Sequence, residues 1–398
     1  MIDKGASVGA PGKSHDEQTG AFVAGNQQHS SDYIRMNTRN PKVSRRGFLW
    51  TAAAFAGSTT LLRSQDEQVR TDSGQRSAAE LRRSAVSVIK GTSRRQSISE
   101  ALVAIEDQIM PVLATKKHVV IKPNIVSTSN QLASTHVDAL HGILDFLAPR
   151  FKGPVIIAES SAGFTTEGFD HFGYAVLAEE HKPLKVQLVD LNEEGQYKTH
   201  TILNGDLHMV HVRLAARLLD PDAYVISSAI LKTHNTVVAT LSIKNMALGA
   251  PLHSAQKESP RWNDKRLYHG GVRQTHVDIA LTAQRLQPYW GLAVLDGWEG
   301  MEGNGPGSGS AVPSRIAIAS TDYVAADRVA LEAMGIDPQW VGYLAFCARA
   351  GLGNAELANI DVRGAKISEV AKKYRMHDDI ERELRWMGPM KEIPEKLG

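Results

Sequence analysis

Short apolar runs of strand length recur along this chain and alternate with segments of helical period. The runs occupy residues 85–89, 118–121, 155–158, 185–190, 223–230, 291–295, 315–319 and 360–362. Between them, segments such as 137–147 and 276–286 carry the apolar spacing of a helix with one buried face. This alternation predicts an α/β fold: a doubly wound, mostly parallel sheet with helices on both faces.

Local patterns add finer expectations. The alternating segment 199–212 predicts a hairpin or a pair of edge strands. Ser97 and Glu100 have the spacing of a capping box, which predicts the start of a helix that continues to about residue 113. A further helix is expected around residues 169–180. Asp322 is expected to cap the helix that follows it.

Two segments are predicted to be loops. The glycine-rich run 296–307 follows a strand, and its backbone amides could face a ligand. The polar segment 251–275 is predicted to be a functional lid or a disordered insertion, since long loops inside a compact domain are uncommon.

Composition excludes several kinds of protein. The chain is 42% hydrophobic and 22% charged, as globular proteins are, and its net charge of +2 gives no reason to expect a nucleic-acid partner. A single cysteine, Cys347, excludes an intrachain disulfide and an iron–sulfur cluster held by the cysteines of this chain alone. Cys347 lies in an apolar helical pattern and is predicted to be a core residue.

The N-terminal region resembles a twin-arginine export signal. Arg45 and Arg46 are followed by Phe48, Leu49 and a short alanine-rich apolar run, as in such signals. The resemblance implies export by the twin-arginine machinery to the periplasm or the extracellular space. The long polar segment before it suggests that Met36 is the true start.

The predicted domain organisation follows from these patterns. We expect a disordered lead-in over residues 1–43, the signal over 44–63, a linker over 64–84, an α/β domain over 85–365 and a charged helical tail over 366–398.

Polar side chains gather at the ends of the predicted strands. In open α/β sheets, ligands bind beyond the carboxyl ends of the strands, so side chains from several strand ends can share one pocket. We expect such a pocket to collect Lys122, Asn124, Glu159, Lys232, His234, Lys244, Asn245, Asp296, Glu302 and Asp327.

These residue types indicate an anion site with acid–base chemistry. Lysines and amides suit a carboxylate or phosphate, and a histidine titrates near neutral pH. The expected catalytic residues are His234, Lys232, Lys244 and Asp296. The expected substrate-binding residues are Lys122, Asn124, Asn245, Glu159, Gly303 and Gly305.

Metal binding is a further possibility for this pocket. Asp296 and Glu302 could hold a divalent cation through oxygen ligands. A zinc site built from histidines is less expected, because no two histidines have the spacing of ligands on one helix.

Several of these motifs together resemble the family known as domain of unknown function 362. They are Lys122-Pro123-Asn124, Lys232-Thr233-His234, Lys244-Asn245 and the run DGWEGMEGNGPGSG, within residues 85–365. The family has no settled activity. Its members commonly resemble iron–sulfur-associated proteins, and some have ferredoxin-like cysteine motifs attached. This chain departs from that pattern, so any cluster would have to come from a partner.

Two hypotheses follow for the function. The first is an exported enzyme that acts on a small anionic molecule by proton transfer or metal-assisted chemistry. The second is a non-catalytic binding protein, or an accessory protein for an iron–sulfur or other redox partner. The mixture of acidic, basic and imidazole groups favours the enzyme, since a simple anion binder has little use for carboxylates.

The export prediction can be tested by replacing Arg45 and Arg46 with lysine. The twin-arginine receptor distinguishes the two side chains, so the variant should remain in the cytoplasm while a chain that begins at Met36 is still exported. Cell fractionation measures both. Equal distribution of the lysine variant and the wild type would contradict the export signal.

Overall fold

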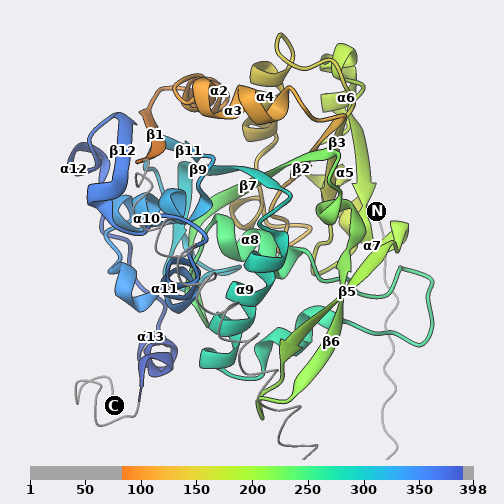
Figure 1. Ribbon diagram of the computed structural model, residues 1–398, viewed down its shortest axis with the longest axis vertical. Helices are drawn as coiled ribbons and strands as arrows, with labels where there is room; N and C mark the ends of the chain where they lie inside the picture. Colours follow the sequence, from red (N-terminus) through yellow and green to blue (C-terminus); the bar gives the residue numbers. More distant parts are fainter. Residues whose placement is uncertain (1–82, 389–398) are drawn as a thin grey trace, which may run out of the picture. The chain divides into compact units, whose positions relative to one another are not determined.

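A ten-stranded sheet forms the centre of residues 83–388, the part of the chain that the computed structural model describes (Figure 1). Eight strands lie side by side in the order β12 (Ile360–Gly364), β1 (Ser84–Lys90), β11 (Ile316–Ser320), β9 (Trp290–Glu302), β7 (Ala223–His234), β2 (His118–Lys122), β3 (Val155–Glu159) and β4 (Gln187–Asp190). β11 is antiparallel to both neighbours, and the other pairs on this path are parallel. Two short strands, β8 (Val238–Thr240) and β10 (Ser310–Val312), pair with β7 and β9. The predicted α/β fold with a mostly parallel sheet is confirmed.

The order of the strands reverses between β2 and β7. From β2 the chain continues outward to β3 and β4, whereas from β7 it continues to β9 on the other side. The segments that leave these two neighbouring strands therefore diverge. Such a switch point leaves a crevice at the carboxyl ends of the strands, where α/β proteins commonly bind ligands.

Helices cover both faces of the sheet. One face packs against α2 (Arg94–Val103), α3 (Glu106–Leu113), α4 (Val137–Leu147), α5 (Thr165–His171) and α6 (Val176–Glu180). The other packs against α8 (Ser242–Gly249), α9 (Val272–Leu286), α10 (Tyr323–Ala333) and α11 (Gly342–Arg349), which buries Cys347. Each layer forms its own hydrophobic cluster, and alternate residues of the central strands contribute to one or the other.

The predicted hairpin is present as β5 (Tyr197–Leu203) and β6 (Met209–Ala215), which form a separate two-stranded sheet. The remaining helices are the short α7 (Leu191–Glu194), α12 (Ile367–Val370) and α13 (Ile380–Glu383). The tail up to residue 388 therefore contains two four-residue helices rather than the longer helical segment expected from its charge pattern. No helix among the described residues is long and apolar enough to span a membrane.

Two helix predictions need correction. Ser93, not Ser97, caps α2: its hydroxyl accepts from the Gln96 amide, while Ser97 lies inside the helix and donates to the Ser93 carbonyl. The expected helix over 169–180 is two helices, α5 and α6. Gly173 between them has a φ of 71°, a left-handed conformation that stops a helix.

The glycine-rich run is largely strand rather than loop. β9 continues to Glu302 and pairs with β10, so the connection covers only residues 303–309. Glycines here allow close packing: a Cβ on Gly297 would lie 2.7 Å from Ile316, and one on Gly300 would lie 2.1 Å from the Tyr374 hydroxyl. Close neighbours of the backbone explain why glycine occupies these positions of β9, and the connection 303–309 explains the glycines that follow.

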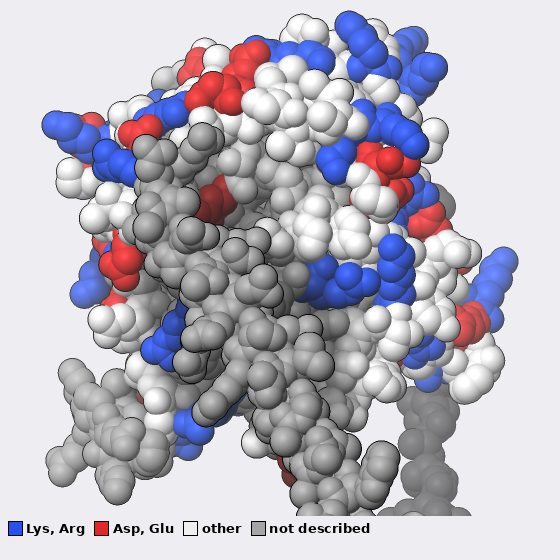
Figure 2. Space-filling model, viewed as in Figure 1, with Lys and Arg blue, Asp and Glu red and all other residues white. Residues whose placement is uncertain are grey.

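The N-terminal signal, the lead-in and most of the linker lie outside the described residues, as do residues 389–398. On the face shown in Figure 2, lysine and arginine side chains are interspersed with aspartate and glutamate over the described surface. That distribution fits the small net charge of the chain.

Asp327 of α10 caps a different helix from its own. Asp322 caps α10, as expected, by accepting from the Val324 and Ala325 amides. The Asp327 carboxylate instead accepts from the Ser242 and Ile243 amides, at 2.9 and 3.0 Å. These amides open α8, which has no side-chain cap of its own. Asp327 is therefore a structural residue. The expectation that it belongs to the pocket is wrong.

Replacing Asp327 with alanine should destabilise the protein by about 2–4 kcal/mol, because it leaves two buried amides unpaired at the start of α8. Urea unfolding measures the change. Asp206, an exposed residue of the β5–β6 turn, provides the control, and its alanine variant should be neutral. Equal stability of the two variants would show that the cap does not hold α8.

Candidate functional site

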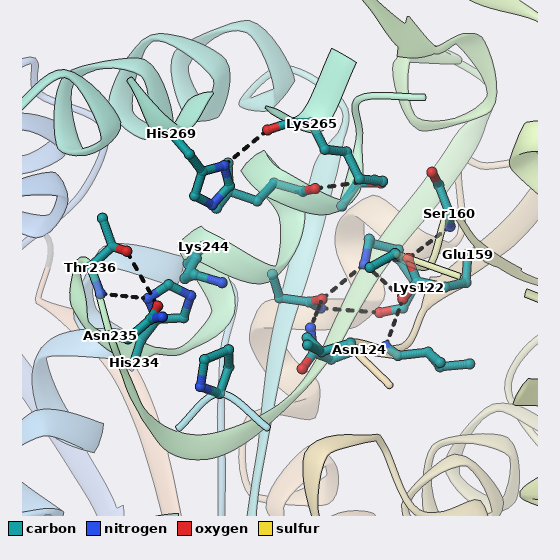
Figure 3. Close-up of a pocket in the computed structure, with 17 residues that line it drawn as sticks. Lys122, Asn124, Glu159, Ser160, His234, Asn235, Thr236, Lys244, Lys265 and His269 are labelled. Atoms are coloured by element: carbon teal, nitrogen blue, oxygen red, sulfur yellow. Dashed lines mark hydrogen bonds and ion pairs between the residues drawn. The ribbon is translucent and has the colours of Figure 1, made fainter. Parts of the chain in front are cut away.

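A cavity of about 320 Å³ lies at the carboxyl ends of β2 and β3, beside the extended end of β7 (Figure 3). α8 forms another wall, and the short 3₁₀ helix η4 (Asp264–His269) contributes the last part of the lining. The polar residues around it are Lys122, Asn124, Glu159, Ser160, His234, Asn235, Thr236, Lys244, Asn245, Lys265 and His269. This is the switch point of the sheet, where the strand order predicts a ligand site.

Lys122 and Glu159 form a buried ion pair in the cavity wall. The Lys122 Nζ lies 2.9 Å from Glu159 Oε1 and donates to the Asn245 Oδ1 and the Pro123 carbonyl, each at 2.8 Å. Burial lowers the pKa of Lys122, and the charge of Glu159 opposes that shift. The glutamate also accepts from the Ile125 and Ser160 amides. The lysine and the glutamate neutralise each other. Their contacts connect the ends of β2 and β3 to α8.

Two asparagines extend this network into the cavity. Asn245 donates to the Ser227 hydroxyl at 3.0 Å and accepts from the Asn124 amide at 3.0 Å. The Asn124 Oδ1 is buried and has no hydrogen-bond partner among residues 83–388. Gly249 permits the close approach of α8, since a Cβ there would lie 2.0 Å from the ε-carbon of Lys122. The cavity therefore contains an acceptor that its own wall does not satisfy.

Lys244 has neither an ion-pair partner nor a hydrogen-bond partner for its Nζ within residues 83–388. It is 5% exposed, and burial together with the nearby Lys122 charge lowers its pKa to about 7. In Figure 3 it lies between the two histidines and the Lys122–Glu159 pair. An amine with this pKa can take up or release a proton at neutral pH.

His234 and His269 present opposite hydrogen-bonding properties to the cavity. The His234 Nδ1 accepts from the Thr236 amide at 3.1 Å, so the neutral ring carries its hydrogen on Nε2. The His269 Nδ1 donates to the Lys265 carbonyl at 3.0 Å, which leaves its Nε2 as an acceptor. Burial, followed by the charge of Lys244, lowers the pKa of both rings, and that of His234 falls well below its usual value. Both are therefore neutral at pH 7.

Lys265 belongs to the polar segment 251–275. Its Nζ donates to the Leu248, Gly249 and Pro251 carbonyls at 3.2, 3.5 and 2.6 Å, and so caps the C-terminal end of α8. Sequence reasoning treated this segment as a lid without selecting Lys265 or His269 for the site. The signal that could have found them was the combination of basic residues and imidazoles in a long internal loop.

Two of the four expected catalytic residues, Lys232 and Asp296, are placed differently. Lys232 is fully buried and donates to the Ala133 carbonyl at 2.7 Å, away from the cavity lining. Burial, and then the charges of Lys244 and Lys122, lower its pKa well below the usual value. Lys232 is therefore a buried neighbour of the site that is bonded to the main chain, not the expected catalytic group in the cavity. Of the four expected catalytic residues, His234 and Lys244 line the cavity and Lys232 and Asp296 do not.

Asp296 lies on the other face of the sheet. Its neighbours at alternate positions, Leu292 and Val294, belong to the hydrophobic cluster beneath α2–α4, and its carboxylate pairs with Arg94 at 3.0 Å. It lines a separate cavity of about 260 Å³. The expectation that Asp296 shares a pocket with His234 is wrong, because alternate residues of a strand point to opposite faces.

The glycine-rich connection contributes less than expected. Glu302 accepts from the Arg375 amide, and the Gly303 carbonyl accepts from Thr233. A Cβ on Gly305 would lie 2.1 Å from the Thr233 carbonyl, which explains the glycine by packing. Neither glycine lines the cavity, although Pro306 does.

The expected oxygen-ligand metal site is not formed by Asp296 and Glu302. Within residues 83–388, one group of three possible ligands has its donor atoms within 4.8 Å of one another: His141, Glu180 and His181. Asp296 is paired with Arg94 and Glu302 with the Arg375 amide, at different places along β9. The sequence spacing missed the histidine group because its members come from two helices.

Comparisons with known proteins assign no activity. A family model described as a domain of unknown function (DUF362) matches residues 119–332, more than half of the chain. No curated protein matches the sequence. A structural-genomics crystal structure from Thermotoga maritima is similar at 10% identity and a TM-score of 0.36, over 66% of this chain and 60% of that one.

Replacing Lys244 with methionine should stabilise the protein. Its pKa is about 7 when folded and near 10.5 when unfolded, so the unfolded chain binds more protons between these values and the wild type gains stability as pH rises through them. The variant should gain about 4–5 kcal/mol at and below neutral pH, and the gain should shrink towards about pH 10.

Denaturant unfolding at several pH values measures this effect. Lys152 is exposed, so its methionine variant should show no such gain and serves as the matched control. A destabilised Lys244→Met protein, or a gain that does not change with pH, would mean that the Lys244 ammonium has an unrecognised partner.

Proposed function

Since the chain belongs to the domain of unknown function 362 family, whose description names no activity, we propose a function from the cavity itself. The protein binds a small anionic molecule at the switch point between β2 and β7 and transfers a proton through Lys244. It is proposed to be an exported enzyme that works by acid–base chemistry.

The observation that carries this proposal is the unpartnered, buried Lys244 with its pKa of about 7. A buried ammonium without a counter-ion is costly, and Lys122 avoids that state by pairing with Glu159. An anionic ligand would supply the missing charge. The free energy that Lys244 costs the empty protein would then be recovered on binding.

Proton transfer is better supported for Lys244 than for His234. The pKa of His234 is lowered well below neutrality by burial and by the neighbouring Lys244 charge, so at pH 7 this ring donates a hydrogen bond from Nε2. His269, with a free Nε2, can accept one. The two neutral rings would orient a substrate that has both a donor and an acceptor, while Lys244 exchanges the proton.

The size and charge of the cavity define the substrate class. About 320 Å³ suits a small metabolite rather than a polymer or a dinucleotide. Glu159 is neutralised by Lys122 and two backbone amides, so it does not oppose an anion. A carboxylate or phosphate group next to Lys244 fits these conditions.

Export through the twin-arginine route remains part of this proposal, which places the activity in the periplasm or outside the cell. A non-catalytic binding protein would use the same cavity and the same anion. The two differ in whether Lys244 is needed only for affinity or also for turnover, and the neutral-pH amine favours turnover.

Calorimetric titration with sulfate and succinate tests the anion site. Both are dianions above about pH 7, so a change in affinity between about pH 7 and pH 8.5 reports the protein. Binding should be tighter at the lower pH, where Lys244 is protonated, and should weaken at least about tenfold in Lys244→Met. Lys152→Met should bind like the wild type.

Competitive acetylation, read by mass spectrometry, provides a second measurement that needs no ligand. Lys244 should react with a midpoint near pH 7. The proposal fails if Lys244 reacts only near the pH at which lysines of the unfolded chain lose their proton, about 10.4, or if wild type and Lys244→Met bind both anions equally.

A further inference from the structure

Two buried histidines meet between helices α4 and α6, away from the cavity. The Nδ1 of His141 lies 2.9 Å from the Nε2 of His181, and their ring centroids are 5.2 Å apart. Glu180, the last residue of α6, brings Oε2 to 3.7 Å from the same His141 nitrogen. The three donor atoms lie within 4.8 Å of one another.

We propose that His141, His181 and Glu180 bind a divalent transition metal, zinc in particular. Two imidazole nitrogens and one carboxylate oxygen are a common set of zinc ligands. Nitrogens that bind zinc at its usual bond length in a tetrahedral site lie roughly 3.3 Å apart. The rings of His141 and His181 reach that separation with a shift of a few tenths of an ångström.

The burial of the pair supports a ligand. His141 and His181 are 5% and 6% exposed, and within residues 83–388 neither ring makes another hydrogen bond. A neutral pair can share only one hydrogen, whereas a metal ion uses both facing lone pairs at once. The side chain of Glu180 is 52% exposed, which leaves the metal a route from solvent.

The surrounding charges favour a cation. Asp138 and Asp145 lie on the same helix as His141, one turn before and one turn after it. Arg95 is the cation that faces the group, and its guanidinium is held by both oxygens of Asp145, at 2.6 and 2.8 Å. Its Nη1 lies 3.7 Å from Glu180 and can orient that carboxylate, as residues behind metal ligands do.

Three protein ligands leave a tetrahedral ion one position for water. Sites of this composition can polarise water or a bound oxygen, whereas structural zinc sites usually have four protein ligands. The layer that contains α4 and α6 covers the opposite face of the sheet from α8, which contains Lys244. This metal site is therefore independent of the proposed proton transfer.

The test uses the full-length protein, treated with a chelator and titrated with Zn²⁺ by calorimetry and with Co²⁺ by visible absorption. The wild type should bind one ion per chain at this site, with the Co²⁺ spectrum of a tetrahedral centre. Glu180→Gln should weaken binding at least about tenfold, and His181→Ala should abolish it.

Two controls separate this site from other histidines. His208 is exposed in the β5–β6 turn, and His234 lines the anion cavity, so His208→Ala and His234→Ala should keep the ion. Circular dichroism checks the folding of each variant. If His181→Ala does not fold, Glu180→Gln still tests the site, because it changes only a half-exposed side chain. The proposal is overturned if the wild type binds no zinc, or if zinc affinity is unchanged in Glu180→Gln.

Discussion

The candidate site depends on the carboxylate of Asp327. It accepts from the first amides of α8, and Lys265 donates to the carbonyls at the other end of the same helix. α8 has only eight residues and no side-chain cap of its own, so an isolated helix of this length would not persist. Both ends are instead held by side chains from distant segments. This arrangement fixes Lys244 and Asn245 against the ends of β2 and β3.

The charged groups that line the cavity differ in how well the protein itself satisfies them. Lys122 and Glu159 satisfy each other and recruit main-chain groups, so this part of the site is complete without a ligand. Lys244, which lies on α8 next to this satisfied pair, has no hydrogen-bond or ion-pair partner for its Nζ among residues 83–388. Part of the electrostatic cost of the empty state therefore falls on that side chain.

Much of the fold could be read from the sequence, and part of the site could not. The apolar runs locate the parallel strands, and Lys122, Glu159 and His234 follow directly from strand ends at the switch point. Strand ends do not reveal the face on which a side chain lies, which is why Asp296 was placed with His234 when it pairs with Arg94. The histidine group around His141 left no trace in sequence spacing, since its members come from separate helices. The pKa of His234 was equally hidden, because burial and a neighbouring lysine set it.

The unpaired Oδ1 of Asn124 has a consequence for selectivity. It is buried without a donor among the described residues, while the amide of the same side chain is held by Asn245 and cannot easily turn away. A bare anion would neutralise Lys244 and still leave this oxygen desolvated. A molecule with a hydroxyl or amino group beside its anionic end would satisfy both. Sites that contain a buried polar group discriminate strongly against analogues that lack its partner. For the anionic ligand proposed above, this unsatisfied acceptor would favour hydroxylated or aminated acids over simple ones of the same charge.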